Sequence, residues 1–302
     1  MTFSTLGHMH TSPTFSDLPQ ELVDRVIDLL RNDAAALRTC SLVGRSTRPR
    51  AQSHIYRSVC LTPSRCVTYN ALAKQSPHLA TAVRHLCVTQ SVYVLIGKKS
   101  HSHLPGYEQV LGPQDARRPH LFPAVTTLKL DLLDPVSLSP SLLSLICDLR
   151  RVETLRLHSC RFTTLDGAAE LICHFPRLKS LTACDIYTQN TFDPRVQEPP
   201  APHMIEGPAS TTVRPALEEL RLYPTSFLGE ISSISLTKWV FEQGMYDRLS
   251  SLQIAVSRRA EVAVLSACLR QLGPRLQHLD LSLEQLDHGG KSASRLRHRL
   301  RS

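Results

Sequence analysis

The chain has 302 residues, of which 42% are hydrophobic, and this composition is typical of a protein that buries a sizeable core. No apolar run approaches the roughly 18 residues of a membrane-spanning helix, and the first 17 residues lack a secretory signal, so we expect neither a membrane partner nor secretion. The formal net charge is +9, but the last twelve residues contribute five of these charges, which leaves +4 for residues 1–290 and disfavours a nucleic-acid ligand.

The first predicted element is a helix that begins at Leu18-Pro19, within a helical module that we place at residues 16–57. We expect residues 1–15 to be disordered. The apolar residues of the helix cover an arc of about 160° and are Leu22, Val23, Val26, Ile27, Leu29 and Leu30. A helix that packs on one neighbour needs an apolar stripe of only about 100°. The wide arc therefore predicts a second apolar neighbour, outside the module.

Two further short helices are predicted in the same module. Asn32 and Asp33 are good caps for the first of them, and Gly44 lies near its end. Pro49 suits the first turn of the next helix, which reaches about Tyr56. Three short helices in about 40 residues bury too little apolar surface to fold well alone. We therefore expect the module to dock on something else.

The segment from Leu18 to Leu61 resembles an F-box. The resemblance rests on the LPxEL start, a helix ending in LL, the CSLV segment, Arg45 and the run RPRAQSHIYRSVCL, in order and without a gap. It implies docking on the Skp-type adaptor of an SCF-type cullin–RING ubiquitin ligase. The residues that match its docking positions are Leu18, Pro19, Leu22, Ile27, Leu30, Cys40, Leu42 and Val43. Gly44 stands where the family commonly has Cys, and Thr47 stands where it has Trp, which removes a large apolar contact.

A six-residue pattern with apolar residues at positions 1, 4 and 6 then recurs eight times. The residues at position 4 are Val59, Leu86, Leu128, Leu155, Leu181, Leu220, Leu252 and Leu279. Their commonest spacing is 27 residues, within the range of about 20–29 for leucine-rich repeats. Helical stretches are predicted between these strands at 64–74, 140–149, 167–174, 236–245 and 260–272. The predicted fold is an α/β solenoid, in which the F-box-like module precedes a curved leucine-rich-repeat solenoid of about eight parallel strands at 58–286.

Together the two parts resemble F-box proteins with leucine-rich repeats, over residues 18–284. The resemblance implies a substrate receptor, in which the F-box binds the adaptor and the solenoid holds an unknown protein substrate. The alternative is a leucine-rich-repeat scaffold that binds a protein partner without a ligase, with the helical module as its cap. Two spacings longer than the repeat predict insert loops near 97–120 and 194–215, where specificity can reside.

Strand alternation predicts which side chains face a substrate. Positions 1, 4 and 6 point into the core, so positions 3, 5 and 7 face the concave surface. The candidate substrate-binding residues there are Lys129, Asp131, Arg156, His158, Glu219, Arg221, Tyr223, Gln253, His278 and Asp280. Lys129, Arg156 and Arg221 share position 5 and predict a basic row suited to an acidic or phosphorylated segment. The alternative is a solvated face with charges placed for solubility.

The end of the chain is predicted to be a basic disordered tail at 287–302, although a nuclear-import or anion-binding patch is an alternative. After Leu279 only Leu281, Leu283 and Leu286 are available to cover the core before Gly289. We therefore expect an exposed apolar end and an unpaired edge on the last strand.

Motifs for catalysis or cofactor binding are missing from the sequence. It has no P-loop, GxGxxG, HExxH or GxSxG segment, and the nine cysteines have no spacing typical of metal ligands. We interpret the cysteines as reduced thiols in the cytoplasm or nucleus. His101 and His103 lack a nearby Cys or acidic partner and are interpreted as a solvated pair. The sequence therefore predicts a protein that is not an enzyme and has no cofactor and no metal.

Overall fold

A computed structural model describes most of the chain. The described residues are 18–89, 122–133, 145–162, 164–188, 214–223, 233–256, 259–283 and 294–298. The chain divides into two compact units, Met1–Arg57 and Ser58–Ser302. The predicted insert loop near 97–120, almost all of the loop near 194–215 and the amino-terminal residues 1–15 lie outside the described residues.

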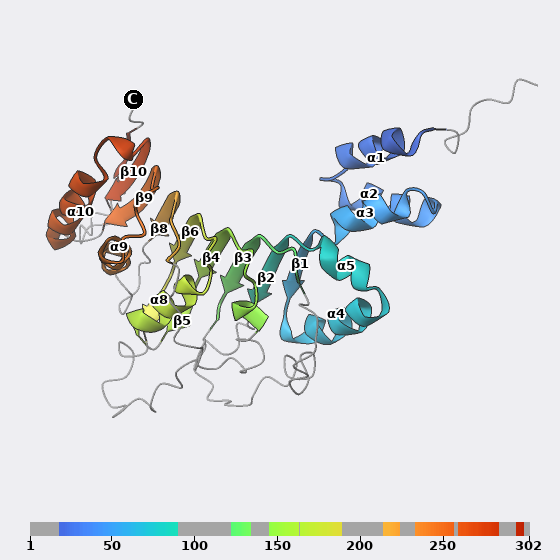
Figure 1. Ribbon diagram of the computed structural model, residues 1–302, viewed down its shortest axis with the longest axis horizontal. Coiled ribbons are helices and arrows are strands. Elements are labelled where there is room, and N and C mark those ends of the chain that lie inside the picture. Colours follow the sequence, from blue (N-terminus) through green and yellow to red (C-terminus); the bar gives the residue numbers. More distant parts are fainter. Residues whose placement is uncertain are drawn as a thin grey trace, which may run out of the picture. The chain divides into compact units, whose positions relative to one another are not determined.

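The described part of the first unit, residues 18–57, contains three helices, drawn in blue in Figure 1. Their bounds are α1 (Gln20–Leu29), α2 (Ala34–Val43) and α3 (Arg48–Ile55). The carboxylate of Asp33 caps α2, because it accepts hydrogen bonds from the backbone N–H groups of Ala35 (3.0 Å) and Ala36 (2.9 Å). Pro49 lies in the first turn of α3, where its missing N–H has no partner to lose. The predicted start signals of α2 and α3 are therefore confirmed.

A small core and one ion-pair network hold the three helices together. The buried core residues are Val23, Ile27, Leu37 and Ala51. Asp28 on α1 accepts hydrogen bonds from Arg50 on α3 at 2.6 and 2.7 Å, and Nε2 of His54 lies 2.7 Å from the same carboxylate. These contacts fasten α1 to α3.

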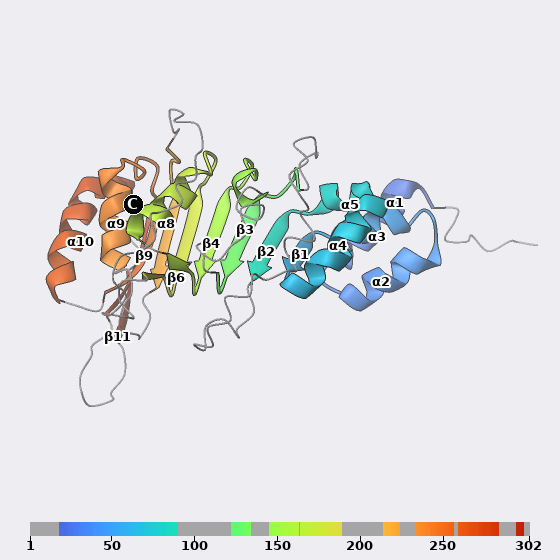
Figure 2. The ribbon, with the colours of Figure 1, turned by 90° about the horizontal axis from the view of Figure 1, so that it is seen from below.

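The second unit contains a sheet of nine strands in the order β1-β2-β3-β4-β6-β8-β9-β10-β11. Eight of them are parallel and are β1 (Ser58–Leu61), β2 (His85–Thr89), β3 (Thr127–Asp131), β4 (Thr154–His158), β6 (Ser180–Cys184), β8 (Glu219–Tyr223), β9 (Ser251–Val256) and β10 (His278–Leu283). Figure 2 shows the first of them side by side in chain order. Neighbouring strands place their position-4 residues opposite each other, from Val59 and Leu86 to Leu252 and Leu279. The eight predicted parallel strands and their register are confirmed.

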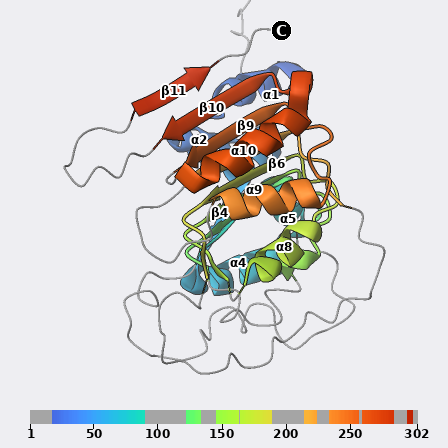
Figure 3. The same cartoon turned by 90° about the vertical axis from the view of Figure 1, so that its left-hand side faces the viewer.

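Helices connect the strands and cover one face of the sheet. They are α4 (Pro63–Gln75), α5 (Pro77–Ala82), α8 (Leu165–Cys173), α9 (Ser233–Glu242) and α10 (Arg259–Leu272). Figure 3 shows α8, α9 and α10 along the same side of the strands. Of the helix predicted at 140–149, only residues from 145 onward are described, and 145–147 are helical. Two short strands that were not predicted, β5 (Arg161–Phe162) and β7 (Tyr187–Thr188), pair with each other.

The two faces of the sheet differ as the alternation predicts. In β4, Leu155 and Leu157 are buried in the same core as side chains of the helices, whereas Arg156 and His158 are not. We call the face that carries positions 3, 5 and 7 of the described strands the polar sheet face. Among the described side chains of this face, that of Ala255 on β9 is buried and the others are exposed or half-buried.

The prediction of an unpaired edge on the last parallel strand, β10, is wrong. Ser294–His298 form β11, which pairs antiparallel with β10, so this edge is not unpaired. The expectation of a disordered tail is wrong for these five residues. Their backbone supplies partners for the outer edge of β10, a requirement that a count of apolar residues does not reveal. The rest of the predicted tail lies outside the described residues.

Candidate functional site

Large apolar side chains are exposed on the helical unit. Among the described residues, every exposed large hydrophobic residue except Val262 belongs to this unit, and we call them the apolar helical surface: Leu18, Leu22, Val26, Leu29, Leu42 and Val43. The exposed fractions are highest for Leu29 (81%), Leu42 (79%) and Val43 (74%). Burying such a side chain is favourable by about 1.5–3 kcal/mol. A group of them on one small unit is typical of a docking surface.

The apolar residues of α1 form two stripes. Val23 and Ile27 face the core of the unit, whereas Leu22, Val26 and Leu29 follow the i, i+4, i+7 spacing on another face and are exposed. The core accounts for one of the two apolar neighbours that the wide arc predicted. The exposed stripe is the part of the arc that a second neighbour would cover.

The exposed end of α2 lies close to the beginning of α1. The side-chain amide of Gln20 donates a hydrogen bond to the backbone carbonyl of Ser46, at 3.1 Å. Ser46 follows Leu42 and Val43 closely in the sequence, so this bond brings the carboxyl end of α2 to the amino end of α1. The exposed residues at the end of α2 are therefore nearest the first turn of α1, and the exposed stripe runs from there along α1 to Leu29.

The structure divides the eight docking residues that the resemblance implies. Those that belong to the apolar helical surface are Leu18, Leu22, Leu42 and Val43, and Pro19 is also exposed. Leu30 and Cys40 are half-buried against the core. The assignment of Ile27 as a docking residue is wrong, because only 1% of it is exposed and it offers no surface to a partner. Val26 and Leu29 are exposed on the same face of α1 as Leu22, but they are not among the docking positions that the resemblance implies.

Thr47, which stands where the F-box family has Trp, is not on the apolar helical surface. It is only 4% exposed, and its hydroxyl lies 2.6 Å from the carbonyl oxygen of Cys40 and 3.1 Å from that of Gly44. The side chain thus ties α2 to the start of α3. An indole in its place would enter the interior of the unit instead of adding to the apolar helical surface.

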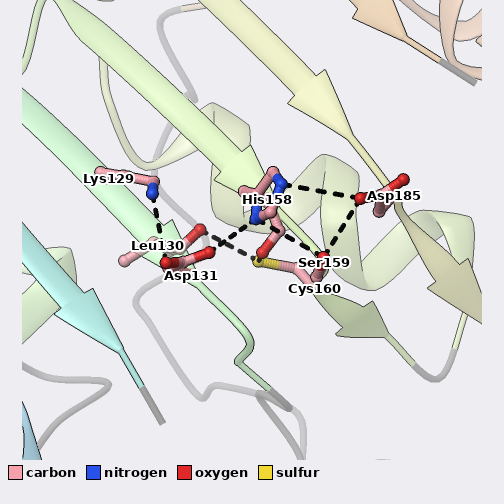
Figure 4. A network of polar contacts seen from close by, with 7 residues as sticks. All are labelled: Lys129, Leu130, Asp131, His158, Ser159, Cys160 and Asp185. Carbon is pink, nitrogen blue, oxygen red and sulfur yellow. Dashed lines mark hydrogen bonds and ion pairs between the residues drawn. The ribbon is translucent and has the colours of Figure 1, made fainter. Parts of the chain in front are cut away.

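The polar sheet face carries a network at the carboxyl ends of β3, β4 and β6, shown in Figure 4. Asp131 accepts a hydrogen bond from Nζ of Lys129 at 3.1 Å, and its other oxygen lies 2.7 Å from Nδ1 of His158. Nε2 of His158 lies 3.6 Å from Oδ2 of Asp185, which also accepts a hydrogen bond from Ser159 at 3.2 Å. The predicted residues Lys129, Asp131 and His158 are therefore in contact, and Ser159 and Asp185 join them.

The residue after each of these three strands has the same unusual backbone conformation, with a positive φ. The residues that follow β3, β4 and β6 are Leu132, Ser159 and Asp185, with φ of 54°, 50° and 59°. Non-glycine residues rarely adopt this left-handed conformation. The N–H of Leu132 donates to the carbonyl of His158, and the N–H of Ser159 donates to that of Cys184, both at 2.9 Å. The turns at Leu132 and Ser159 are therefore each bonded to the end of the next strand, which fixes the side chains around them.

A second network lies at the amino ends of β6 and β8. Glu219 accepts hydrogen bonds from Ser180 (2.7 Å) and from Nε of Arg221 (2.9 Å). Burial alone would raise the pKa of Glu219, but these hydrogen bonds outweigh it, so the pKa lies below its usual value. Glu219 is therefore a fixed negative charge on the polar sheet face.

A third network joins three further predicted residues across β8, β9 and β10. The hydroxyl of Tyr223 donates to Oε1 of Gln253 at 2.9 Å, and Nε2 of Gln253 donates to Asp280 at 3.1 Å. His278, the remaining predicted residue on β10, is exposed. The polar sheet face is thus an ordered surface of hydrogen-bonded side chains.

The three residues of the predicted basic row lie on the same face, but neighbouring acidic side chains offset their charge. Lys129 lies opposite Arg156, and Arg221 lies two strands beyond Arg156. Lys129 is paired with Asp131, and Arg221 with Glu219. The ten predicted residues include three bases and three acids, so their formal charge is zero with the histidines neutral. The surface suits a peptide with mixed polar groups better than a polyanion.

No model of a known protein family matches the chain, and no curated protein sequence matches it either. A search of the described helices finds none with the length and apolar character required to cross a bilayer. The chemistry of the apolar helical surface and the polar sheet face is therefore what bears on the function.

Proposed function

We propose that the chain is a non-catalytic substrate-recognition subunit that links a target protein to a cullin–RING (SCF-type) ubiquitin ligase. In this proposal the helical unit is an F-box that binds a Skp-type adaptor. The second unit is a leucine-rich-repeat solenoid that binds the target. The observation that carries the proposal is the exposure of Leu18, Leu22, Leu42 and Val43, which match docking positions of the F-box pattern.

The energy available at the apolar helical surface supports a stable contact. Leu29, Leu42 and Val43 each remain more than two-thirds exposed, and burying one such side chain contributes about 1.5–3 kcal/mol. A few of these contacts in the centre of an interface are enough to dominate its affinity. Val26 and Leu29 extend the surface along α1, so the proposed adaptor contacts this helix as well as the end of α2.

The polar sheet face supports a role in holding a protein target. Adjacent parallel strands present side chains at intervals of about 4.8 Å, so the face is a regular array of donors and acceptors. Tyr223, Arg156 and Arg221 are of the residue types enriched at protein–protein interfaces. The mixed charge of the face favours a protein target over a nucleic acid.

Co-purification with a Skp-type adaptor and its cullin tests the proposal. The full chain should recover both proteins, whereas a Leu42→Asp, Val43→Asp variant should recover neither, because two carboxylates would be buried against an apolar partner. Val262→Asp, at an exposed apolar residue of the second unit, is the matched control and should recover both. A parent chain that recovers target proteins but no adaptor would favour the scaffold that binds without a ligase.

A further inference from the structure

Two side chains of the polar sheet face and the residue that follows β6 have the composition of a transition-metal site. His158, Cys184 and Asp185 offer an imidazole nitrogen, a thiol sulfur and a carboxylate oxygen that all lie within 4.8 Å of one another. We propose that these three residues bind a divalent metal ion of the zinc class. The site is independent of the proposed ligase role, since it is argued from these side chains alone.

The distance between His158 and Asp185 favours a shared ion over a direct hydrogen bond. Nε2 and Oδ2 lie 3.6 Å apart, which exceeds the length of a hydrogen bond. Two ligands at roughly 2.0–2.1 Å from a tetrahedral zinc ion lie about 3.3–3.4 Å from each other. The observed pair is within a few tenths of an ångström of that separation. The sulfur of Cys184, with Zn–S of about 2.3 Å, has to approach the other two ligand atoms by at most about 1.3 Å from the 4.8 Å limit.

Asp131 orients the imidazole for metal binding. Its carboxylate lies 2.7 Å from Nδ1 of His158, and Lys129 pairs with its other oxygen. An Nδ1–H that donates to Asp131 leaves a lone pair on Nε2, the ring nitrogen that faces Asp185 in Figure 4. A carboxylate behind a histidine is the usual outer support of a metal-binding imidazole.

The backbone holds the three ligands in place. His158 and Cys184 are opposite each other on the paired strands β4 and β6, and Asp185 is the next residue after β6. The N–H of Ser159, in the left-handed turn after β4, donates to the carbonyl of Cys184, so the strand ends that carry His158 and Cys184 are bonded to each other. Ligands on a rigid framework lose little freedom when the ion binds.

The types of the ligands select the metal. A thiolate and an imidazole favour zinc and similar ions over magnesium and calcium, which prefer oxygen ligands. Three protein ligands leave one position of a tetrahedral ion for water or for a side chain of a bound protein. None of the nine cysteines is in a disulfide, so the sulfur of Cys184 is not bonded to another cysteine.

Titration of the full chain with Co²⁺, after treatment with a chelator, tests the site. We expect a single equivalent of Co²⁺ to give tetrahedral visible bands and a thiolate-to-cobalt charge-transfer band, and Zn²⁺ to displace it. Cys184→Ser should abolish the charge-transfer band, and His158→Ala and Asp185→Asn should weaken binding strongly. Asp131→Asn should lower the affinity by about 10–100-fold, since it removes only the support of the imidazole.

Cys87→Ser is the matched control, because Cys87 is a half-buried thiol on β2, a strand that pairs with β3 and not with β4 or β6, and lies outside the cluster. It should leave the cobalt spectrum unchanged, and circular dichroism should show each variant folded. The proposal is overturned if the parent chain gives no thiolate band, or if Cys184→Ser keeps it. In either case the three residues form an ion-pair network without a metal.

Discussion

Ile27 and Leu29 lie two residues apart on α1, yet 1% of Ile27 and 81% of Leu29 is exposed. A helix turns by about 100° per residue, so two residues place side chains on nearly opposite faces. The inner face of α1 packs on the core of the helical unit. The outer face supplies the stripe that we propose meets the adaptor.

The first prediction compares these two residues. Ile27→Ala should destabilise the helical unit by about 2–5 kcal/mol, because it leaves a cavity in a small core. Leu29→Ala should change stability by less than about 0.5 kcal/mol, because the side chain is already in water. Limited proteolysis combined with thermal unfolding measures both, and equal sensitivity of the two variants would show that the stripes are assigned incorrectly.

The second prediction concerns Asp28. Hydrogen bonds from Arg50, and then from His54, hold the pKa of Asp28 well below its usual range. Because the folded pKa is lower than the unfolded value of about 3.9, the contact stabilises the unit above that pH and is lost progressively as the pH falls below it. The Asp28 and Arg50 side chains are 39% and 43% exposed, so screening limits the contribution to about 1 kcal/mol.

Asp28→Asn should therefore destabilise the helical unit by about 1 kcal/mol at pH 7, and the difference from the parent should shrink in acid. Urea unfolding at pH 7 and at several values below pH about 4 measures it. A difference that stays constant across these pH values would mean that the Asp28 charge does not stabilise the fold.

The third prediction concerns Thr47. Thr47→Val keeps the shape but removes the hydroxyl that lies 2.6 Å from the carbonyl of Cys40, and should destabilise the unit by about 1 kcal/mol. Thr47→Trp should destabilise it further, because an indole does not fit in place of a buried threonine. It should not strengthen adaptor binding. Tighter binding by the folded Trp variant would place this position on the docking surface after all.

The fourth prediction concerns Arg156, an exposed residue at the centre of the predicted basic row. If the target carries an acidic or phosphorylated segment, Arg156→Glu should weaken its binding about tenfold, the effect of losing one charged hydrogen bond. Arg177→Glu, at an exposed residue outside the strands, is the control. Proximity labelling with quantitative mass spectrometry compares the two, and identical sets of labelled proteins would remove Arg156 from the target site.

Much of the second unit could be predicted from the sequence, because each strand repeats the same packing requirement. Leu128 and Leu155, for example, have to be buried side by side, and their spacing fixes the register. β11 has no such signature, since its residues do not carry the repeat pattern and its pairing with β10 satisfies backbone groups. The sequence pattern therefore indicates which residues enter the core but not how an edge strand is covered.

The candidate sites were predicted less completely. Motif matching selected Ile27 because the F-box pattern contains an apolar residue there, although the helical face decides which apolar residue is free to bind. Cys184 occupies the same repeat position as His158 but resembles a small hydrophobic residue. Asp185 lies beyond the repeat pattern, and only the left-handed turn brings it to His158.

The affinity of the purified full chain for a Skp-type adaptor, measured by calorimetry, tests the central proposal most directly. We predict that the parent and Val262→Asp bind with the same Kd, and that Leu29→Asp binds at least about tenfold more weakly, since a tenfold change corresponds to only about 1.4 kcal/mol. Circular dichroism should show all three folded. A parent chain that does not bind the adaptor, or a Leu29→Asp variant that binds it as tightly as the parent, would contradict the assignment of the apolar helical surface as an F-box.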